Sequence, residues 1–342
     1  MDFNLMLFFI ALFMSLIFLW WAGGLSVNYS IQMADIFNLN TLFIGFVLIS
    51  ISTGLPELSI AISSTLRGVQ EVSVGDILGS NVCDLSLVLG LAILIYGSIK
   101  IDKKEMRDSL ILLFVTALSM GAIFFVGRLN SFTGIIFISI YFISIGWLWL
   151  TSTKKEILEE EKIQEKIKSE ELQLDVKAGR GQRQKPGRAS RKKKFLIVLK
   201  FLGSLVLVLG ASELAVHFAI QITNKLALSL KTIGATIFAV GTSLPELSLS
   251  LNALKQKQYS LALGNALGSV LEQGTLLIGI LAVISGNSIN TANLRSLAPF
   301  MFFSFFIIAF SIIKRKKIGR IEASLLLLSF LSFLIYQIFW VR

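Results

Sequence analysis

Cysteine, histidine, proline and charged side chains are all scarce in this chain. Among its 342 residues are one cysteine, one histidine and four prolines, and only 15% of the residues are charged. The lone Cys83 excludes an intrachain disulfide. Cys83 and His217 provide no cluster of soft metal ligands, so we expect Cys83 to be a buried packing residue and His217 to make helix-packing or polar contacts. The polar segment at 153–194 also lacks the spacing of an EF-hand, which excludes a calcium-sensing module of that type.

Apolar residues are abundant instead. They form 54% of the chain, and the mean hydropathy is +0.77. A soluble protein of this length could not bury so much apolar surface. Runs of about 20 apolar residues, enough to span roughly 30 Å of hydrocarbon, recur along the sequence. They predict an all-α polytopic protein of the cell membrane with ten transmembrane helices. The expected spans are 4–27, 39–66, 72–98, 108–127, 131–152, 195–222, 229–254, 259–284, 294–314 and 320–341.

The net charge of +11 reports topology rather than a nucleic-acid partner, because the basic residues lie in loops between the spans. One set of alternate loops holds Lys100, Lys103, Lys104, Arg107, Lys255, Lys257, Lys314, Arg315, Lys316, Lys317, Arg320 and the central basic segment. The other set holds only Arg67, Arg128, Lys225, Lys231, Arg295 and Arg342. The positive-inside rule therefore predicts that both termini are outside and that the central loop is cytoplasmic.

An internal repeat divides the chain. Residues 53–59 recur as residues 242–248, and the constant offset that carries position 53 onto position 242 aligns the two halves over most of three spans. Each half has five predicted spans, an odd number, so the second half inserts inverted relative to the first. Many secondary transporters use such inverted repeats to place a binding site near the midplane. We expect the repeats at 1–152 and 195–342.

A linker at 153–194 joins the repeats. Residues 154–174 mix Glu and Lys with apolar residues at helical spacing, and residues 176–194 are rich in Gly, Gln, Arg and Lys. Clustered basic residues are attracted to anionic lipid, so we interpret the linker as a topology-setting segment that contacts the cytoplasmic leaflet. A regulatory role is the alternative.

Two of the four prolines, Pro56 and Pro245, occupy equivalent places inside apolar spans. Proline removes a backbone donor, so the carbonyl four residues earlier, at Ser52 or Gly241, loses its helical partner. Beside these carbonyls lie a hydroxyl and a carboxylate in each copy, namely Thr53 and Glu57 or Thr242 and Glu246. Such hard oxygen ligands suit calcium and sodium. A charge at the centre of a membrane helix is expensive, so two at matched positions indicate a cation site.

The next span of each repeat adds polar oxygens. Ser80 with Asp84, and Ser269 with Gln273, are one helical turn apart and lie on one helix face. We expect Asp84 and Gln273 to be ligands. Glycines at a spacing of one turn in both spans, at positions 75, 79, 264 and 268, predict close helix packing.

These segments resemble the alpha repeats of the cation/calcium antiporter superfamily, closest to its prokaryotic sodium/calcium exchanger branch. The resemblance implies ten helices in two inverted repeats, with four central helices that bind calcium and sodium alternately. It implies that Glu57 and Glu246 bind calcium. It also assigns to ion coordination Thr53, Thr242, Ser243, Ser80, Ser269, the carbonyls near Ser50 and Ala239, and the pair Asp84 and Gln273.

The chain departs from the family pattern at several positions. Gly54 replaces the serine that the second repeat keeps at Ser243, and Val270 stands where the family commonly has Asn. Close relatives often have an amide in the first repeat and Asp in the second, whereas here Asp84 comes first and Gln273 second. The proton-coupled branch has an acidic residue shortly after Gly-Asn in both repeats, a pattern absent here, so sodium coupling is preferred.

The sequence thus predicts a secondary active antiporter that exchanges calcium for sodium by alternating access. It would have no enzymatic activity and no cofactor, and its self-contained repeats are compatible with a monomer. Calcium/proton antiport and a cation channel remain as alternatives. An intramembrane aspartyl protease is disfavoured, because Asp76 aligns with Asn265 and no second aspartate motif completes the pair.

Overall fold

The computed structural model describes residues 3–37, 53–101, 103–148, 150, 191–226, 229–255, 257, 259–286 and 289–340. Within these ranges, nine helices are long and apolar enough to cross a membrane. The predicted helical membrane protein is thereby confirmed. The span expected at 39–66 is described only from residue 53, and residues 151–190 of the linker region lie outside the described residues. The count of ten helices stays a prediction.

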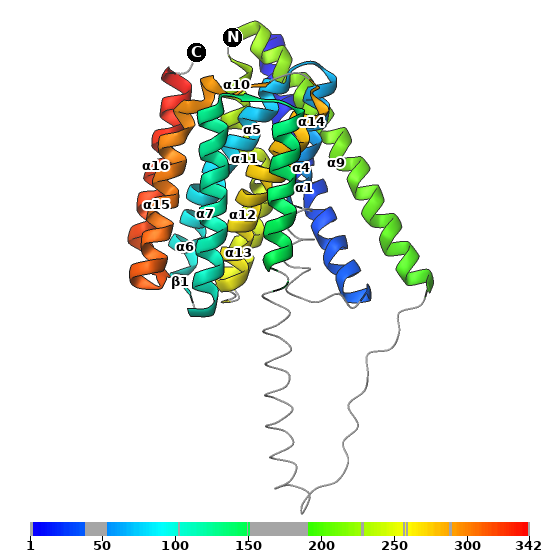
Figure 1. The fold of residues 1–342 in the computed structure, drawn as a ribbon. Coiled ribbons are helices and arrows are strands. Elements are labelled where there is room, and N and C mark those ends of the chain that lie inside the picture. The colour runs from blue at the N-terminus through cyan, green and yellow to red at the C-terminus, as the bar shows by residue number, and fades with distance from the viewer. Residues whose placement is uncertain are drawn as a thin grey trace, which may run out of the picture.

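Many helices of the two halves have matching bounds, and Figure 1 shows their arrangement. The first half contains α1 (Phe3–Phe37), α4 (Leu55–Leu66), α5 (Gln70–Cys83), α6 (Leu89–Tyr96), α7 (Lys103–Val126) and a helix at Ser131–Leu148. The second half contains α9 (Arg191–Leu226), α10 (Leu230–Ile233), α11 (Ala239–Thr242), α12 (Leu244–Lys255), α13 (Tyr259–Leu271), α14 (Ile278–Ile284), α15 (Ala298–Arg315) and α16 (Arg320–Trp340). Three π-helical turns, η2 (Asp84–Val88), η3 (Gly234–Phe238) and η4 (Glu272–Leu277), and the 3-10 turn η5 (Ala292–Leu297) connect some of them.

The sequence offset between the repeats also relates these elements. It carries α4 onto α12, and the first residues of α5 and α6 onto those of α13 and α14. Equivalent helices run in opposite directions, since α1 descends in Figure 1 whereas α9 ascends. The start of α1 and the end of α16 lie at one end of the bundle, and the helix ends that lead into the linker lie at the other. This arrangement is an inverted repeat.

Short strands tie the repeats together at both ends of the bundle. β1 (Ile99–Lys100) pairs with β4 (Lys317–Ile318), and β2 (Arg128–Leu129) pairs with β3 (Ile289–Asn290), both antiparallel. Each pair joins one loop of the first half to one loop of the second. The sequence analysis predicted helices alone, and these very short strands are confined to loops, so the class remains helical.

Glycines allow the centre of the bundle to form. α5 packs against α10, η3 and α11 of the other half. A Cβ on Gly79 would lie 2.6 Å from the carbonyl oxygen of Ala235 and 2.8 Å from the Cβ of Ala239. A Cβ on Gly75 would clash with the carbonyl of Lys231. Two of the four predicted packing glycines thus bring backbones of opposite repeats into contact, as small residues do in membrane helices.

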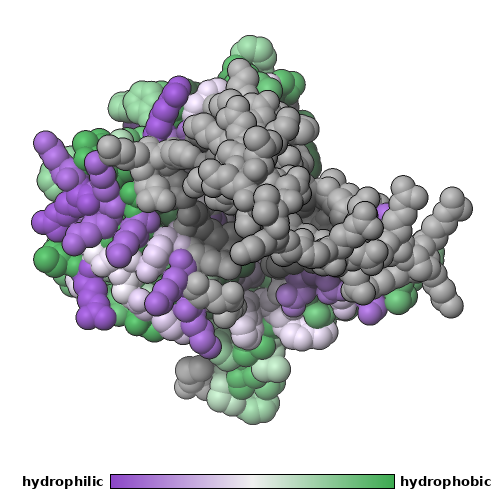
Figure 2. Space-filling model, turned by 90° about the horizontal axis from the view of Figure 1, so that it is seen from below, coloured by the Kyte–Doolittle hydropathy of each residue, from purple (hydrophilic) through white to green (hydrophobic). Residues whose placement is uncertain are grey.

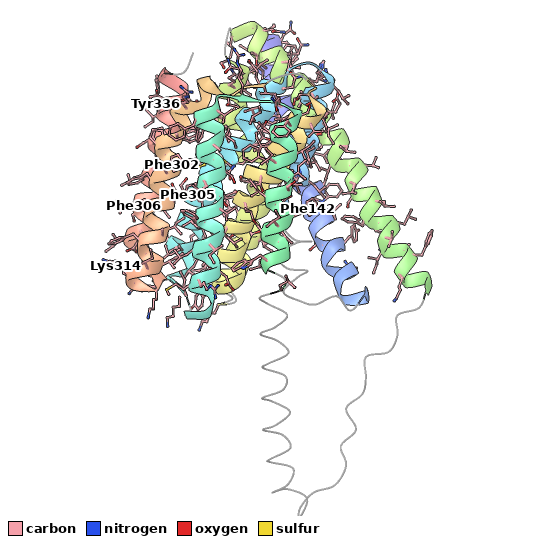
Figure 3. All side chains as sticks on the ribbon, in the orientation of Figure 1. Phe142, Phe302, Phe305, Phe306, Lys314 and Tyr336 are labelled. Atoms are coloured by element: carbon pink, nitrogen blue, oxygen red, sulfur yellow. The ribbon has the colours of Figure 1, made fainter. Side chains whose placement is uncertain are left out.

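The buried side chains form two large apolar clusters. One is centred on α5, α6 and α13 to α16, and the other joins α1 and α9 with parts of α4 and η3. The outside of the bundle carries large apolar residues, as a surface in contact with lipid requires. Phe306 on α15 is 66% exposed, and Phe142 on the Ser131–Leu148 helix is 62% exposed (Figure 3).

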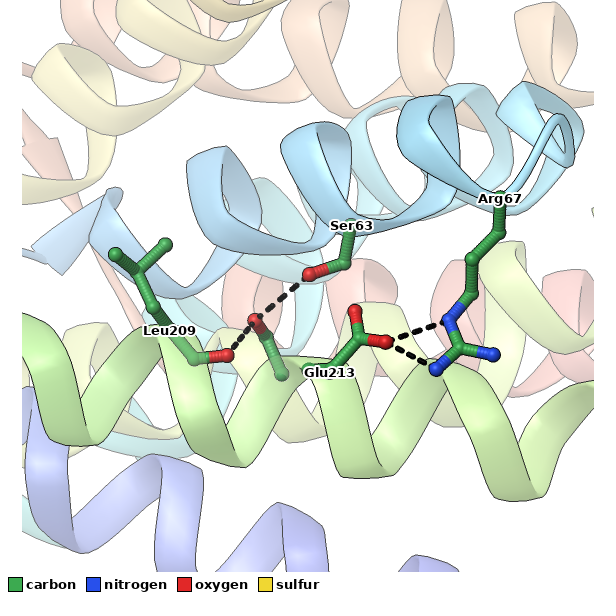
Figure 4. Close-up of polar contacts among 5 residues, drawn as sticks. Ser63, Arg67, Leu209 and Glu213 are labelled. Carbon is green, nitrogen blue, oxygen red and sulfur yellow. Dashed lines mark hydrogen bonds and ion pairs between the residues drawn. The ribbon is translucent and has the colours of Figure 1, made fainter.

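Polar contacts hold α4 to α9 (Figure 4). Arg67 donates through Nε and Nη2 to one carboxylate oxygen of Glu213, and the hydroxyls of Ser63 and Ser212 lie 3.4 Å apart. Ser212 donates to the carbonyl of Leu209. The ion pair is partly exposed, so it fixes geometry more than it adds stability.

Basic side chains gather at the linker end. Seen from this end, hydrophilic residues cover one edge of the molecule (Figure 2). The β1–β4 pair and Lys314 lie at this end in Figures 1 and 3. The exposed basic residues of these loops are Lys100, Arg107, Lys314, Arg315, Lys316, Lys317 and Arg320.

The close approach at Gly79 makes a testable prediction about stability. Gly79→Ala places a Cβ against backbone atoms of η3, so we expect a loss of about 1–3 kcal/mol, typical of overpacking. Gly210→Ala on α9 is the control, because nothing lies within 4 Å of its added Cβ. Thermal unfolding of the purified variants in detergent should show a lower Tm for Gly79→Ala alone. Equal Tm values would contradict the close packing.

Candidate ion-binding site

The backbone breaks at the same point in both repeats. Gly54 (φ −76°, ψ −1°) precedes α4, and Ser243 (φ −77°, ψ 3°) separates α11 from α12. The proline that follows shortly after cannot donate a helical hydrogen bond, which accounts for a break at this point. Each break places a glutamate in the first turn of the new helix, Glu57 in α4 and Glu246 in α12. The positive end of the helix dipole there favours a negative charge.

Glu57 and Glu246 are fully buried. None of their four side-chain oxygens has a hydrogen-bond partner among the described residues. A buried ionised group is stable only when another group compensates its charge. Two such carboxylates are therefore suited to bind a positive charge.

The two glutamates face groups of the opposite repeat. Glu57 interacts with the hydroxyl of Thr242, and Glu246 interacts with that of Thr53, too loosely in each case to satisfy a carboxylate oxygen. The carboxylates also repel one another, because Glu246 interacts electrostatically with Glu57 and Asp84. This crosswise arrangement links the first turn of α4 to the end of α11, and the first turn of α12 to Thr53 just before α4.

Asp84 and Gln273, which are related by the repeat, meet directly. Gln273 Nε2 donates to Asp84 Oδ2 over 2.9 Å, and both side chains are buried. Both residues lie in π-helical turns, η2 and η4, a local geometry that is frequent at functional sites. The remaining oxygens, Asp84 Oδ1 and Gln273 Oε1, have no partner among the described residues. Each is therefore available to a ligand.

Ser80 belongs to the same centre. Its hydroxyl lies 3.2 Å from Thr242 Oγ1 and donates to the carbonyl oxygen of Ala239 over 3.4 Å. The buried hydroxyl of Ser243 approaches the Asp84 carboxyl but has no partner at hydrogen-bond geometry in the described part of the chain. Ser269, the counterpart of Ser80, instead donates along its own helix to the carbonyl of Asn265 over 2.9 Å. The predicted Ser50 lies outside the described residues.

Two buried residues at the centre were not predicted as ligands. Asp76 accepts a hydrogen bond from Thr242, and Asn265 donates to the carbonyl oxygen of Glu246 and to Ser250 Oγ. Their spacing could have revealed them. Asp76 and Asn265 lie one helical turn before Ser80 and Ser269, on the same helix face, and are themselves related by the offset between the repeats.

Glu272 is a further buried acid, and its Oε2 also has no hydrogen-bond partner among the described residues. It is 2% exposed, and it interacts electrostatically with Tyr141 on the Ser131–Leu148 helix.

Among the described residues, no group of three His, Cys, Asp or Glu side chains is placed to hold a metal ion. The oxygens that converge here come from carboxylates, hydroxyls, an amide and a carbonyl together, a donor set that suits hard cations.

The contact between Asp84 and Gln273 supports a prediction. Gln273→Met removes the donor and leaves a buried carboxylate oxygen without its partner, which costs roughly 1–3 kcal/mol or more for a charged group. Thermal unfolding in detergent without added ions should show a lower Tm. Gln337→Met is the control, since Gln337 is also buried but its Nε2 has no partner among the described residues. A larger loss for Gln337→Met would contradict the role of the hydrogen bond.

Comparison with known proteins identifies the family. Residues 7–150 and 196–339 match the family described as sodium/calcium exchanger protein. An uncharacterized membrane protein of Methanocaldococcus jannaschii is 30% identical over 271 residues, which cover 78% of this chain and 80% of that protein. The sodium/calcium exchanger MaX1 of Methanosarcina acetivorans is 26% identical over 350 residues, with coverage of 96% and 97%.

The fold also has a solved counterpart. A structure of the sodium-calcium exchanger NCX_Mj, soaked with Na+ and Sr2+, aligns with 99% of this chain and 100% of its own at a TM-score of 0.63 and 24% identity. That likeness shows the fold, and the match of both halves to one family profile shows the relationship. The chain is a multi-pass membrane protein that belongs to the sodium/calcium exchanger family.

Proposed function

We propose that this protein exchanges calcium for sodium across the membrane at the site between its two repeats. The observation that carries the proposal is the pair of buried glutamates, Glu57 and Glu246, whose side-chain oxygens have no hydrogen-bond partner in the described residues. A relative is named a sodium/calcium exchanger, and the solved structures with the same fold bear the name of a sodium-calcium exchanger soaked with Na+, Ca2+ or Sr2+. Calcium and sodium ions both prefer oxygen ligands.

The proposed ligands come from both repeats. The first repeat would contribute Glu57, Thr53, Ser80, Asp84 and the carbonyl near Ser50. The second would contribute Glu246, Thr242, Ser243, Gln273, Ser269 and the carbonyl of Ala239. With the site empty, the carboxylates repel one another in a medium of low dielectric constant. A bound cation relieves this repulsion. An ion-loaded protein can therefore change conformation more easily than an empty one, which is the physical basis of obligatory exchange by alternating access.

The remaining organisation follows from the charge distribution. We infer that residues 1–152 and 195–342 act as two inverted units and that the 153–194 linker is cytoplasmic, near anionic lipid. The basic residues of the β1–β4 end lie at the same end as the linker, so the positive-inside rule favours both termini outside. Because the site is formed within one chain, a monomer is sufficient for exchange.

Transport in proteoliposomes tests the function. With sodium inside, uptake of radioactive calcium should depend on the outward sodium gradient. Glu57→Gln and Glu246→Gln each remove one buried charge. Removal of one partner of a buried ion pair, here a glutamate and its bound cation, costs about 3–5 kcal/mol. Uptake at low calcium should therefore fall by more than about 100-fold. Glu213→Gln on α9 is the control, because its side chain is 45% exposed and its ion pair with Arg67 is partly exposed as well.

Other outcomes of this experiment would identify the alternatives. Uptake that ignores sodium and follows a pH gradient would establish calcium/proton antiport. Flux that needs no counter-ion on the opposite side would indicate a cation channel. Uptake that Glu57→Gln and Glu246→Gln leave intact would place the ion site elsewhere.

Cysteine labelling tests the orientation. Cys83 is 1% exposed, so the native background should be low. Arg128→Cys and Lys317→Cys lie in exposed strand positions that the repeat relates, at opposite ends of the bundle. A membrane-impermeant maleimide added to intact cells should label Arg128→Cys and not Lys317→Cys. The reverse pattern would place both termini inside.

A further inference from the structure

Asp76 brings an additional carboxylate to the ion site. It lies on α5, one helical turn before Ser80, and its side chain is fully buried. Asp76 Oδ1 accepts a hydrogen bond from Thr242 Oγ1 over 3.0 Å. Its second oxygen, Oδ2, has no hydrogen-bond partner among the described residues. Asp76 is thus in direct contact with a residue proposed to bind the ion.

The opposite repeat has no such charge. The counterpart of Asp76 is Asn265, a neutral amide whose Nδ2 donates to the carbonyl oxygen of Glu246 over 3.2 Å and to Ser250 Oγ over 3.1 Å. Asn265 thus supports the backbone of α12, whereas Asp76 contacts a threonine hydroxyl across the repeat boundary. The site is asymmetric at this pair of positions.

The contact with Asp76 orients Thr242. A threonine hydroxyl has one proton. The acceptors near Thr242 Oγ1 are Asp76 Oδ1 and the carbonyl oxygen of Phe238, both at 3.0 Å, Ser80 Oγ at 3.2 Å and, more loosely, the Glu57 carboxyl. A charged acceptor forms the stronger hydrogen bond, and Asp76 is the carboxylate at hydrogen-bond distance, so the proton is directed to Asp76. The lone pairs of Thr242 Oγ1 are then turned away from Asp76 and are available to a cation.

Asp76 also adds charge to the centre. It interacts electrostatically with Glu57 and with Asp84. The energy between a fixed charge and an ion is proportional to the charge of the ion. An extra carboxylate at a given distance therefore stabilises a divalent ion twice as strongly, in free energy, as a monovalent ion in the same place.

We propose that Asp76 is a specificity-determining positioning residue of the ion site, which orients Thr242 and favours a divalent cation over a monovalent one. The proposal rests on the proposed function for the identity of the two ions. It concerns equilibrium binding, so it is tested without transport.

The test measures binding of radioactive calcium to the purified protein in detergent, with sodium as the competitor. Asp76→Asn keeps the shape and a neutral acceptor for Thr242 but removes the charge. We expect the Kd for calcium to rise about 10-fold and the apparent Kd for sodium about 3-fold. The loss of binding free energy is proportional to the charge of the ion, so the fold-change for calcium is the square of the fold-change for sodium. Equal changes for both ions, or no change, would overturn the proposal.

A double-mutant cycle tests the contact with Thr242. Thr242→Val, alone and combined with Asp76→Asn, should show non-additive losses of calcium affinity, as expected for residues that act together. Additive losses would overturn the orienting role. Asp108→Asn, near the start of α7, is the control for a generic loss of an aspartate. If Asp76→Asn does not fold, Asp76→Ser also removes the charge within the available space and should give the same ranking of the two ions.

The outcomes separate the two proposals. Wild-type protein that binds no calcium would overturn the proposed function and the role of Asp76 together. Wild-type protein that binds calcium while Asp76→Asn behaves identically would overturn the role of Asp76 alone. Calcium binding with the expected shifts, but without sodium-driven uptake, would support Asp76 and overturn sodium coupling.

Discussion

Carboxylates without hydrogen-bond partners in the interior of a membrane protein are the constraint on which this structure depends. Burial of a charge in low dielectric is costly unless an opposite charge compensates it. Glu57 and Glu246 are buried in this way at equivalent positions, and the surrounding groups compensate their charges in part. The helix breaks place them at helix N-termini, and hydroxyl groups of the opposite repeat approach them. In the proposed function, a bound cation completes the compensation.

Backbone packing makes that convergence possible. At Gly75 and Gly79, α5 approaches α10 and η3 so closely that no side chain larger than a hydrogen atom fits between the two backbones. The same approach brings Asp76 and Ser80 of the first repeat to Thr242 and the Ala239 carbonyl of the second. The proposed ion site and this packing seam are therefore one feature. A change in the seam alters the distances between oxygens contributed by different repeats.

The sequence predicts the apolar membrane helices well, because each depends on a local pattern of residues. The offset between the repeats anticipates that Asp84 and Gln273 are equivalent, and the structure brings them into contact. The roles of individual oxygens are harder to predict, since they depend on side-chain direction across the repeat boundary. Ser269 bonds to its own helix, Glu272 interacts with Tyr141, and Asp76 joins the centre. Periodicity places these residues on a face but does not choose their partners.

The two repeats make unequal contributions to one site. Glu57, Asp76 and Asp84 all belong to the first repeat, while the equivalents of the two aspartates are the neutral amides Asn265 and Gln273. The second repeat has the extra hydroxyl of Ser243 opposite Gly54. In an alternating cycle, inverted repeats exchange conformations, and identical repeats would make the inward- and outward-facing states equal in energy. Here the charge lies mainly on one repeat and neutral oxygens on the other. In the proposed cycle, the symmetry between the two end states is therefore broken at the proposed ion site itself.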